Sequence, residues 1–191
     1  MNDYFKEDIS NEHLTSLFLS NIEIVNKMLN NSTVKHSTFS EIKFDNVIFN
    51  NIIFEHVDLS NSAFTNCGLH NCRFIDCKML GALFSESTIK NTSFSSIIGK
   101  YISFSSSKLI DVNINNSDLS EGKFFDLRLK NFTLTEVNLT QVEFNIVSLN
   151  NVDLTKSNIE NILIDPKYLK GSIMEYSQMI NLAPLLGIKI K

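Results

Sequence analysis

The chain has 191 residues, with 17 basic and 21 acidic residues and a formal net charge of −4. This length fits a single domain, and so mild a charge does not call for nucleic acid or another strongly charged partner. The sequence contains no apolar run long enough for a transmembrane helix, and its first four residues lack a signal-peptide core. We therefore expect no membrane association, no direct binding of nucleic acid and a cytoplasmic location.

Residues 1–31 have an apolar residue at every fifth position, but they do not follow the full pattern of the later chain. The position two residues before each apolar residue is small in later segments, whereas here it carries charge at Glu7, Glu12 and Lys27. A narrow core cannot bury an unpaired charge. The sequence therefore predicts an N-terminal cap over residues 1–31.

From Val34 to Ile164 every fifth residue is apolar, with the sole exception of Gly99, and no insertion shifts the frame. This spacing fits neither an α-helix nor a plain β-strand, so it is an internal repeat. Residues two positions apart lie on the same face of an extended chain. The large residue and the small residue two positions before it therefore both point inward. The Asn, Asp and Ser residues between them favour turns. Each unit of five residues is thus one side and one corner of a coil.

Residues at a spacing of twenty form columns of one chemical type. Phe44, Phe64, Phe84, Phe104, Phe124 and Phe144 share one column, and Asn51, Asn71, Asn91, Asn131 and Asn151 lie in another. Stacked parallel coils favour such ladders of like residues. Residues 32–165 are therefore predicted to form an all-β solenoid, a four-sided parallel β-helix of about seven coils.

The repeat resembles the pentapeptide-repeat family, whose motif is roughly Ala-(Asp/Asn)-Leu-x-x. The motif is clear in residues 57–61 (VDLSN), 117–121 (SDLSE) and 152–156 (VDLTK). The resemblance implies a right-handed quadrilateral parallel β-helix, which agrees with the column argument.

Two features inside the repeat have alternative interpretations. At Gly99, either Ile97 and Ile102, which occupy normally small positions, fill the vacancy, or the chain bends there as a hinge. Cys67, Cys72 and Cys77 occupy three consecutive small inward positions; small buried filler is favoured over a metal or redox site, because the spacing matches no zinc pattern.

Charged residues sort onto faces of the predicted coil. One face is basic and carries Lys90, Lys108, Arg128 and Lys130, with Asp111 as its only acidic residue. Another face is mainly acidic and carries Glu41, Asp58, Asp118, Glu121 and Glu160, together with the basic residues Lys78 and Lys100. Each face is either a solvated surface or a docking face. His36, His56 and Asp76 also stack at a spacing of twenty, which we interpret as an exposed polar column rather than a metal site.

Residues 166–191 are predicted to form a C-terminal helix and a short strand. Pro166 ends the coil, Ser172 and Glu175 fit a capping box, and a helix is expected to run to about Leu186 with Pro184 ending or kinking it. Gly187 is the expected C-cap, followed by a strand over residues 188–190. The helix has more apolar residues than one capping face needs, which predicts a homodimer through Tyr176, Met179, Leu182, Leu185, Leu186, Ile188 and Ile190.

No catalytic residue set, phosphate-binding loop, cofactor motif or metal-ligand cluster appears, so we expect a protein that is not an enzyme and needs no cofactor. The repeats together with the C-terminal helix and the Leu186–Ile188 tail look like the Qnr-type quinolone-resistance proteins. That resemblance implies a DNA-mimic-like protein that acts on DNA gyrase and topoisomerase IV and protects them from quinolones, with Asp58, Asp118 and Glu121 as partner-binding residues. The alternative is a binding or structural scaffold for another protein. A DNA mimic should show a continuous negative stripe, which Lys78 and Lys100 interrupt.

Overall fold

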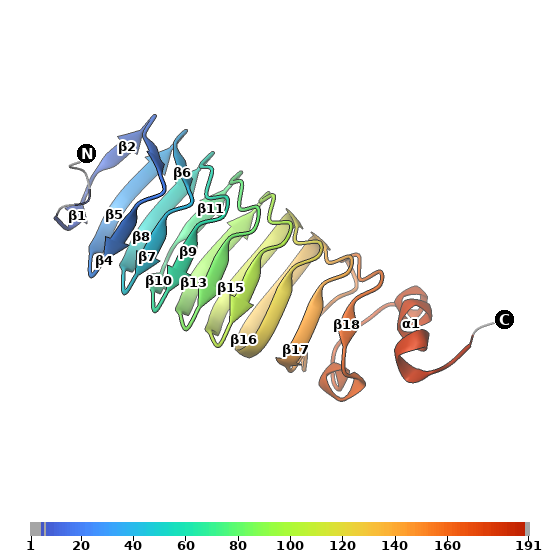
Figure 1. The fold of residues 1–191 in the computed structure, drawn as a ribbon. Coiled ribbons are helices and arrows are strands. Elements are labelled where there is room, and N and C mark those ends of the chain that lie inside the picture. Colours follow the sequence, from blue (N-terminus) through green and yellow to red (C-terminus); the bar gives the residue numbers. More distant parts are fainter. Residues whose placement is uncertain (1–4, 6, 190–191) are drawn as a thin grey trace.

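The structure, a computed structural model, describes residue 5 and residues 7–189. The chain forms a parallel β-solenoid of about eight turns with one short α-helix, α1 (Tyr176–Leu182), at its C-terminal end (Figure 1). The strands are β1 (Ile9–Ser10), β2 (His13–Thr15), β3 (Phe18–Ser20), β4 (Glu23–Val25), β5 (Met28–Lys35), β6 (Thr38–Ser40), β7 (Lys43–Asp45), β8 (Ile48–Glu55), β9 (Ala63–Thr65), β10 (Gly68–His70), β11 (Arg73–Ile75), β12 (Leu83–Ser85), β13 (Thr88–Ser95), β14 (Ser103–Ser105), β15 (Lys108–Asp118), β16 (Lys123–Asn138), β17 (Glu143–Val147) and β18 (Leu163–Ile164).

The strands pair in parallel with a constant register of twenty residues. Leu69 of β10 lies opposite Phe49 of β8 on one side and Ile89 of β13 on the other. The same offset joins Phe84 to Phe64 and Phe104. Strands that neighbour each other in the sheet are therefore one turn apart in the chain, and the predicted four-sided coil is confirmed.

The corners of the coil are built by residues in left-handed backbone conformation. Positive φ recurs every five residues over most of the solenoid, for example at Asn46 (52°), Asn51 (56°) and Asn66 (54°). Asn and Asp tolerate this conformation better than other side chains. The short polar residues of the repeat thus turn the chain at each corner, while the apolar residues between them face inward.

The core is a set of stacked inward side chains. The phenylalanines of one column stack with ring centroids 4.8 Å apart for Phe44–Phe64, 4.6 Å for Phe64–Phe84 and 4.8 Å for Phe84–Phe104. Serines at the small inward positions satisfy backbone groups of adjacent turns. The Ser62 hydroxyl, for instance, accepts from Ile42 N–H (3.0 Å) and donates to Phe39 O (2.6 Å). This pattern leaves the interior filled by side chains.

The three cysteines are buried and free, in line with their interpretation as filler. The Cys72 thiol lies near the carbonyl oxygens of Phe49 (3.5 Å) and His70 (3.4 Å). Burial raises the thiol pKa to about 12 for Cys72 and to about 11 for Cys67 and Cys77. A thiol held neutral in this way is a poor nucleophile and a poor metal ligand.

The solenoid starts earlier than the sequence indicated. Ile9 pairs with Leu29 and Leu14 with Val34, so the regular turns begin at Ile9 rather than near Ser32, and there are about eight of them rather than seven. The charged side chains of Glu7 and Glu12 are exposed in this first described turn, and that of Lys27 is partly buried. The charge at these positions is thus not a departure from the fold.

At Gly99 the frame is unbroken, and neighbouring side chains fill the vacancy. A Cβ atom placed on Gly99 would lie 3.0 Å from Leu119 Cδ2 and 3.4 Å from Ile97 Cδ1. Both side chains are buried. Ile97 therefore contributes as expected, whereas Leu119 of the next turn, and not the expected Ile102, is the other nearest side chain. Gly99 N–H still donates to Asp118 O (2.7 Å).

The C-terminal segment differs from the prediction at its start and at its end. The residue before α1 is Glu175, whose N–H donates to Gln178 Oε1 (2.9 Å), whereas the Ser172 hydroxyl donates to Leu169 O (2.7 Å). The expected capping box at Ser172 is therefore wrong. Two 3₁₀ helices, Pro166–Leu169 and Ala183–Leu186, flank α1.

Pro184 and Gly187 have the predicted effects on this segment. The α-helix ends at Leu182, where a 3₁₀ helix containing Pro184 follows, and Gly187 caps it with φ of 70°. Ile188 and Lys189 are not strand residues, so the predicted strand is wrong for these two, and Ile190 lies outside the described residues. Within the described part of the chain, no helix is long and apolar enough to cross a membrane.

Candidate functional site: an opened groove on the basic face

Near the C-terminal end of the solenoid, two successive turns separate. The pairing of β16 with the next turn stops at Leu127, opposite Val147, and resumes with the bridge between Asn138 and Asn158. Within the described chain, no backbone hydrogen bond joins residues 128–136 to residues 148–156. One edge of β16 is therefore left without its strand partner.

Equivalent backbone groups in other turns show which bonds are missing. Asn71 N–H donates to Lys90 O of the next turn (3.0 Å), and Leu149 N–H donates to Tyr168 O (2.9 Å). By the same geometry, the N–H groups of Leu129 and Asn131 point toward residues 148–150, which lie out of reach. Unpaired strand edges are templates for the pairing of another chain.

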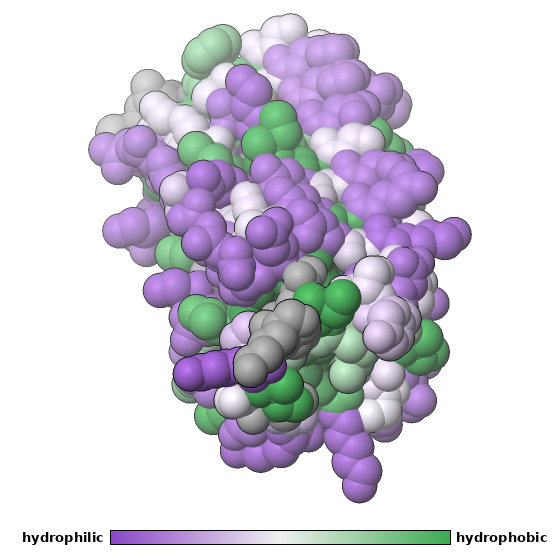
Figure 2. Space-filling model, turned by 90° about the vertical axis from the view of Figure 1, so that its right-hand side faces the viewer, coloured by the Kyte–Doolittle hydropathy of each residue, from purple (hydrophilic) through white to green (hydrophobic). Residues whose placement is uncertain are grey.

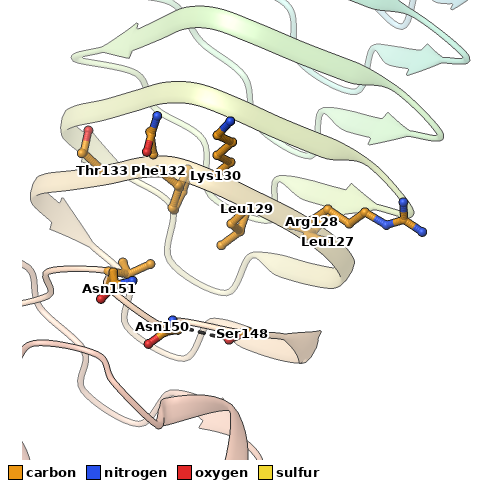
Figure 3. Close-up of a pocket in the computed structure, with 11 residues that line it drawn as sticks. Leu127, Arg128, Leu129, Lys130, Phe132, Thr133, Ser148, Asn150 and Asn151 are labelled. Atoms are coloured by element: carbon orange, nitrogen blue, oxygen red, sulfur yellow. Dashed lines mark hydrogen bonds between the residues drawn. The ribbon is translucent and has the colours of Figure 1, made fainter.

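The separation produces a groove of about 670 Å³. Residues 127–133 of β16 form one wall, and Ser148, Asn150, Asn151 and Val152 form the other (Figure 3). The dashed line in Figure 3 is the contact from Asn150 N–H to the Ser148 hydroxyl (3.4 Å), so this wall satisfies part of its backbone locally. A second groove of about 220 Å³ continues along Thr133–Thr135 toward Asp153 and Lys156.

Two oversized side chains lie where the turns separate. In the small inward positions, Leu127 follows Ser87 and Ser107 of the preceding turns, and Phe132 follows Thr92 and Val112. Extra volume in a packed core forces backbone shifts. Leu127 and Phe132 are slightly exposed, at 7% and 5%, and Leu129 is only partly buried, whereas Leu109 and Val112 are fully covered. The opening coincides with these two residues, and Phe132 is the larger departure, since Ile52 fills the same small position where the turns stay paired.

The corner before the groove adds backbone strain. Ile146 has φ of 57°, where the same corner in earlier turns is Asn46, Asn66 or Asp126. A β-branched residue adopts this conformation only at an energetic cost. The strained corner lies two residues before Ser148, where the facing wall begins.

The outer face beside the groove is basic. Arg128 and Lys130 are exposed on β16, and Lys108 and Lys90 lie on the same face one and two turns earlier. Asp111, the acid of this face, accepts from Asn131 Nδ2 (2.7 Å). The sequence analysis identified this basic face but missed the groove, although Phe132, an aromatic residue at a small position, was a visible signal.

The acid face holds its predicted residues in fixed positions. Asp58 and Asp118 lie in one column, joined by the bridges Asp58↔Lys78, Lys78↔Ile98 and Ile98↔Asp118. Their carboxylates cap turns, since Asp58 accepts from Ser60 N–H (3.0 Å) and Asp118 accepts from Ser120 N–H (3.0 Å).

The third acidic residue of the set is neutralised by a neighbour. Glu121 forms an ion pair with Lys100 (2.9 Å), which also lies over the Tyr101 ring at 4.9 Å. Lys78 occupies the column between Asp58 and Asp118. The structure therefore brings Asp118 and Glu121 onto neighbouring columns, but positive side chains divide the negative surface.

The predicted dimer residues do not all lie on one outer surface. Tyr176, Met179 and Ile188 are exposed, at 88%, 48% and 53%, whereas Leu182 is 2% exposed and belongs to the core. Leu185 packs partly against the core; nothing is described of the Leu186 side chain or of Ile190. Leu182 thus packs against the last turn rather than facing outward.

The C-terminal end has a hydrophobic surface beside this segment. Figure 2 faces that end of the rod and shows hydrophobic residues gathered there, bordered by hydrophilic ones. Pro166, Leu169, Met174, Met179 and Leu185 line a groove of about 340 Å³. The buried Gln178 amide fastens α1 to the last turn by donating to Leu154 O (2.7 Å) and Ser157 O (2.8 Å).

The histidine column forms a stack rather than a metal site. The rings of His36 and His56 lie 5.0 Å apart at 11°, and His56 Nε2 is 4.0 Å from Asp76 Oδ2. Among the described residues, no group of three or more His, Cys, Asp or Glu side chains is arranged to hold a metal ion.

Comparisons with known proteins give a family match and several similar folds. The pentapeptide repeat region family matches residues 47–124. A trypsin-treated variant of QnrB1, a plasmid-mediated fluoroquinolone resistance protein, is 18% identical, with 94% of this chain and 99% of that chain covered and a TM-score of 0.45. Full-length QnrB1 is 20% identical, covering 92% of this chain and 100% of that chain, with a TM-score of 0.28.

A third similar structure is HetL, a pentapeptide repeat protein involved in heterocyst differentiation regulation from the cyanobacterium Nostoc sp. strain PCC 7120. It is 13% identical, with 91% of this chain and 88% of that chain covered and a TM-score of 0.32. No curated protein sequence matches the chain at a significant level.

Proposed function

The chain carries a pentapeptide repeat region at residues 47–124, and from that premise we propose that it is a non-enzymatic protein that binds partners along the outside of its rod. The observation that carries this proposal is the filled interior. The largest inward side chains, among them Phe64, Phe84 and Phe104, are fully buried and stack on one another. Any ligand must therefore bind to the outer faces, the opened groove or the two ends.

As the specific partners we propose DNA gyrase and topoisomerase IV, with protection from quinolones as the result. The proposal is supported by the resemblance of the repeat motifs to Qnr-type proteins and by the shared column of Asp58 and Asp118 with Glu121 beside it. It carries with it a cytoplasmic location, where these enzymes act on chromosomal DNA. Because Lys78 and Lys100 interrupt the negative surface, we propose local contacts by Asp118 and Glu121 rather than mimicry of a whole DNA duplex.

The experiment is a gyrase supercoiling assay with ciprofloxacin, with and without the purified protein. We expect the protein to restore supercoiling, and the pair Asp118→Asn with Glu121→Gln to reduce the rescue severalfold. Asn keeps the turn cap, because Asn138 and Asn158 in the same column already accept from Thr140 N–H and Glu160 N–H. The loss would thus report on charge and not on folding.

A matched control removes the same charge from other faces. Glu86→Gln with Asp126→Asn changes two exposed acids of a different corner column, away from the acid face, and should leave the rescue unchanged. If the unmodified protein gives no rescue in vitro and no quinolone protection in cells, the topoisomerase proposal is wrong. The interrupted acid face then favours the alternative, a scaffold for a different protein.

A further inference from the structure

We propose that the opened groove binds an extended acidic segment of a partner protein, which inserts as a parallel strand beside β16. The inference rests on the proposed role as a binding rod but not on a topoisomerase partner. It uses the basic face, whereas the topoisomerase proposal uses Asp118 and Glu121, so the two can fail separately.

The first argument is the backbone of β16. Over residues 128–136 one edge of this strand lacks the interstrand hydrogen bonds that other turns make. A peptide backbone supplies the alternating donors and acceptors that such an edge needs, as in recognition by strand addition. Nucleic acid and small anions do not offer this pattern. The described residues therefore favour a polypeptide as the occupant.

The second argument is the register of side chains. On β16, Leu129 points inward between the outward residues Arg128 and Lys130, and Phe132 is the next inward position. A strand paired in register places its own side chains directly opposite. An acidic, an apolar and an acidic residue in succession would thus meet Arg128, Leu129 and Lys130. The apolar residue would complete the cover of the partly buried Leu129.

The third argument is charge. Arg128 and Lys130, the outward residues that line the groove, are basic, and the carboxylate of Asp111 is held by Asn131. Unlike charges opposite each other on adjacent strands are favourable, and like charges are unfavourable. The groove therefore selects an acidic segment over a basic one.

We assign the occupant to another molecule, because residues 148–156, which face the unpaired edge, make no backbone hydrogen bonds with it. The C-terminal segment is held elsewhere, because Gln178 fastens α1 to Leu154 and Ser157.

The experiment uses the full-length protein and the probe peptide acetyl-Glu-Leu-Glu-Asn-Val-Thr-Leu-Thr-amide. Its first three residues match Arg128, Leu129 and Lys130, its Asn suits the left-handed corner, and its Val lies opposite Phe132. Titration calorimetry should show saturable binding at low salt that weakens as salt is raised. The same peptide with Lys in place of both Glu residues should bind about tenfold more weakly.

Charge exchange tests the register directly. Arg128→Glu with Lys130→Glu should abolish the preference for the acidic peptide and transfer it to the lysine peptide. The matched control, Lys90→Glu with Lys108→Glu, makes the same charge change on the same face where the turns are closed, and it should retain the original preference. If the two peptides bind equally to the unmodified protein, or if the control reverses the preference as fully as the groove variant, the proposal is wrong.

A second measurement tests the groove independently of charge. The amide protons of Leu129 and Asn131 should exchange quickly with solvent in the free protein and slowly with the acidic peptide bound. Phe132→Val restores the residue found at Val112 and Val152, so it should let the turns close, protect both amides without peptide and reduce peptide binding. Protected amides in the unmodified free protein, or unchanged exchange on adding peptide, would contradict the inference.

Discussion

Single residues in this protein divide cleanly between corner and core. Corner residues adopt left-handed backbone at positions such as Asn51, Asn71 and Asn91, because short polar side chains tolerate that conformation. Core residues are fully covered only where their size matches the available space. The cysteines and Gly99 show how closely each core position is fitted.

The buried thiols give the first prediction at this scale. Because folding raises the pKa of Cys72 from 9.0 to about 12, the folded state favours the neutral thiol. The resulting stability is fully present below the unfolded pKa and is lost as pH rises from about 9 through about 12. We expect the melting temperature to fall across that range, and to fall less in the variant Cys72→Ser.

Thiol reactivity provides the check at neutral pH. The described thiols should react with a disulfide reagent only as the chain unfolds, since the thiolate is the reactive form. Rapid labelling of the native protein at pH 7 would show that the cysteines are not buried filler.

The packing around Gly99 gives a second prediction. Leu119 and Ile97 already occupy the space that a side chain would need, so Gly99→Leu should destabilise the fold by about 1–3 kcal/mol through overpacking. Adding Ile97→Ala should recover part of that loss. Denaturant unfolding of the two single variants and the double variant measures the coupling; strictly additive effects would mean that Ile97 does not fill the gap.

At the scale of elements, stability comes from columns that cross the turns. Phe104 stacks on Phe84 at 4.8 Å and on Phe124 at 5.3 Å, and contacts Phe94 edge-on at 6.2 Å. Removing it leaves a cavity in the middle of the ladder. Phe104→Ala should therefore cost about 3–5 kcal/mol of unfolding free energy.

A phenylalanine on the outer face provides the control for Phe104→Ala. Phe125 lies one residue after a core position but is 43% exposed on the outer face, so Phe125→Ala should change stability far less. Thermal or urea denaturation of both variants decides the matter. Equal stability of Phe104→Ala and the unmodified protein would contradict the stacked column.

At the scale of the whole molecule, the rod has two different ends. Exposed charged residues lie at the first turn, whereas the C-terminal end has α1 and exposed apolar side chains at Met179, Ile180 and Ile188. We propose that two copies meet at this end about a two-fold axis, which is the commonest way to cover such a surface. The dimer would be a rod of twice the length.

Sedimentation of the purified protein tests the dimer. We expect a dimer at micromolar concentration, and a folded monomer for Met179→Asp, which places a charge on the outer apolar surface. Leu83→Asp is the control, since Leu83 is similarly exposed, at 46%, in the middle of the rod, and it should remain dimeric. A single species near 22 kDa for the unmodified protein would defeat the proposal. Leu182 is unsuited to this test because it belongs to the core.

The repeat determined the coil because every unit repeats the same local choice. Each unit combines an apolar residue such as Phe64, a small residue two positions earlier such as Ser62, and a polar corner residue such as Asn61. These three specify one side and one corner of the coil without reference to distant contacts. The spacing of twenty then fixed the register, the core columns and the filler role of the cysteines. These features could be predicted from the sequence alone.

Other features depended on what lies next to a residue in space. The charged side chains of Glu7 and Glu12 are exposed within a regular turn, which their identity alone does not reveal. At the other end, Gln178 reaches Leu154 and Ser157 across the last turn, and this contact accompanies a helix that starts at Tyr176 instead of near Ser172. Neither outcome could be predicted from the local sequence, because each depends on what lies beside the residue in space.

The groove shows most clearly what only the tertiary structure decided. Leu127 and Phe132 are apolar residues in an unbroken frame, so the periodic pattern counts them as ordinary core. Their volume matters only when the adjacent turns are stacked, because the space at a small position is set by the neighbours above and below. The sequence by itself determined the rod, its faces and its columns; the packing of turn on turn decided where the rod opens.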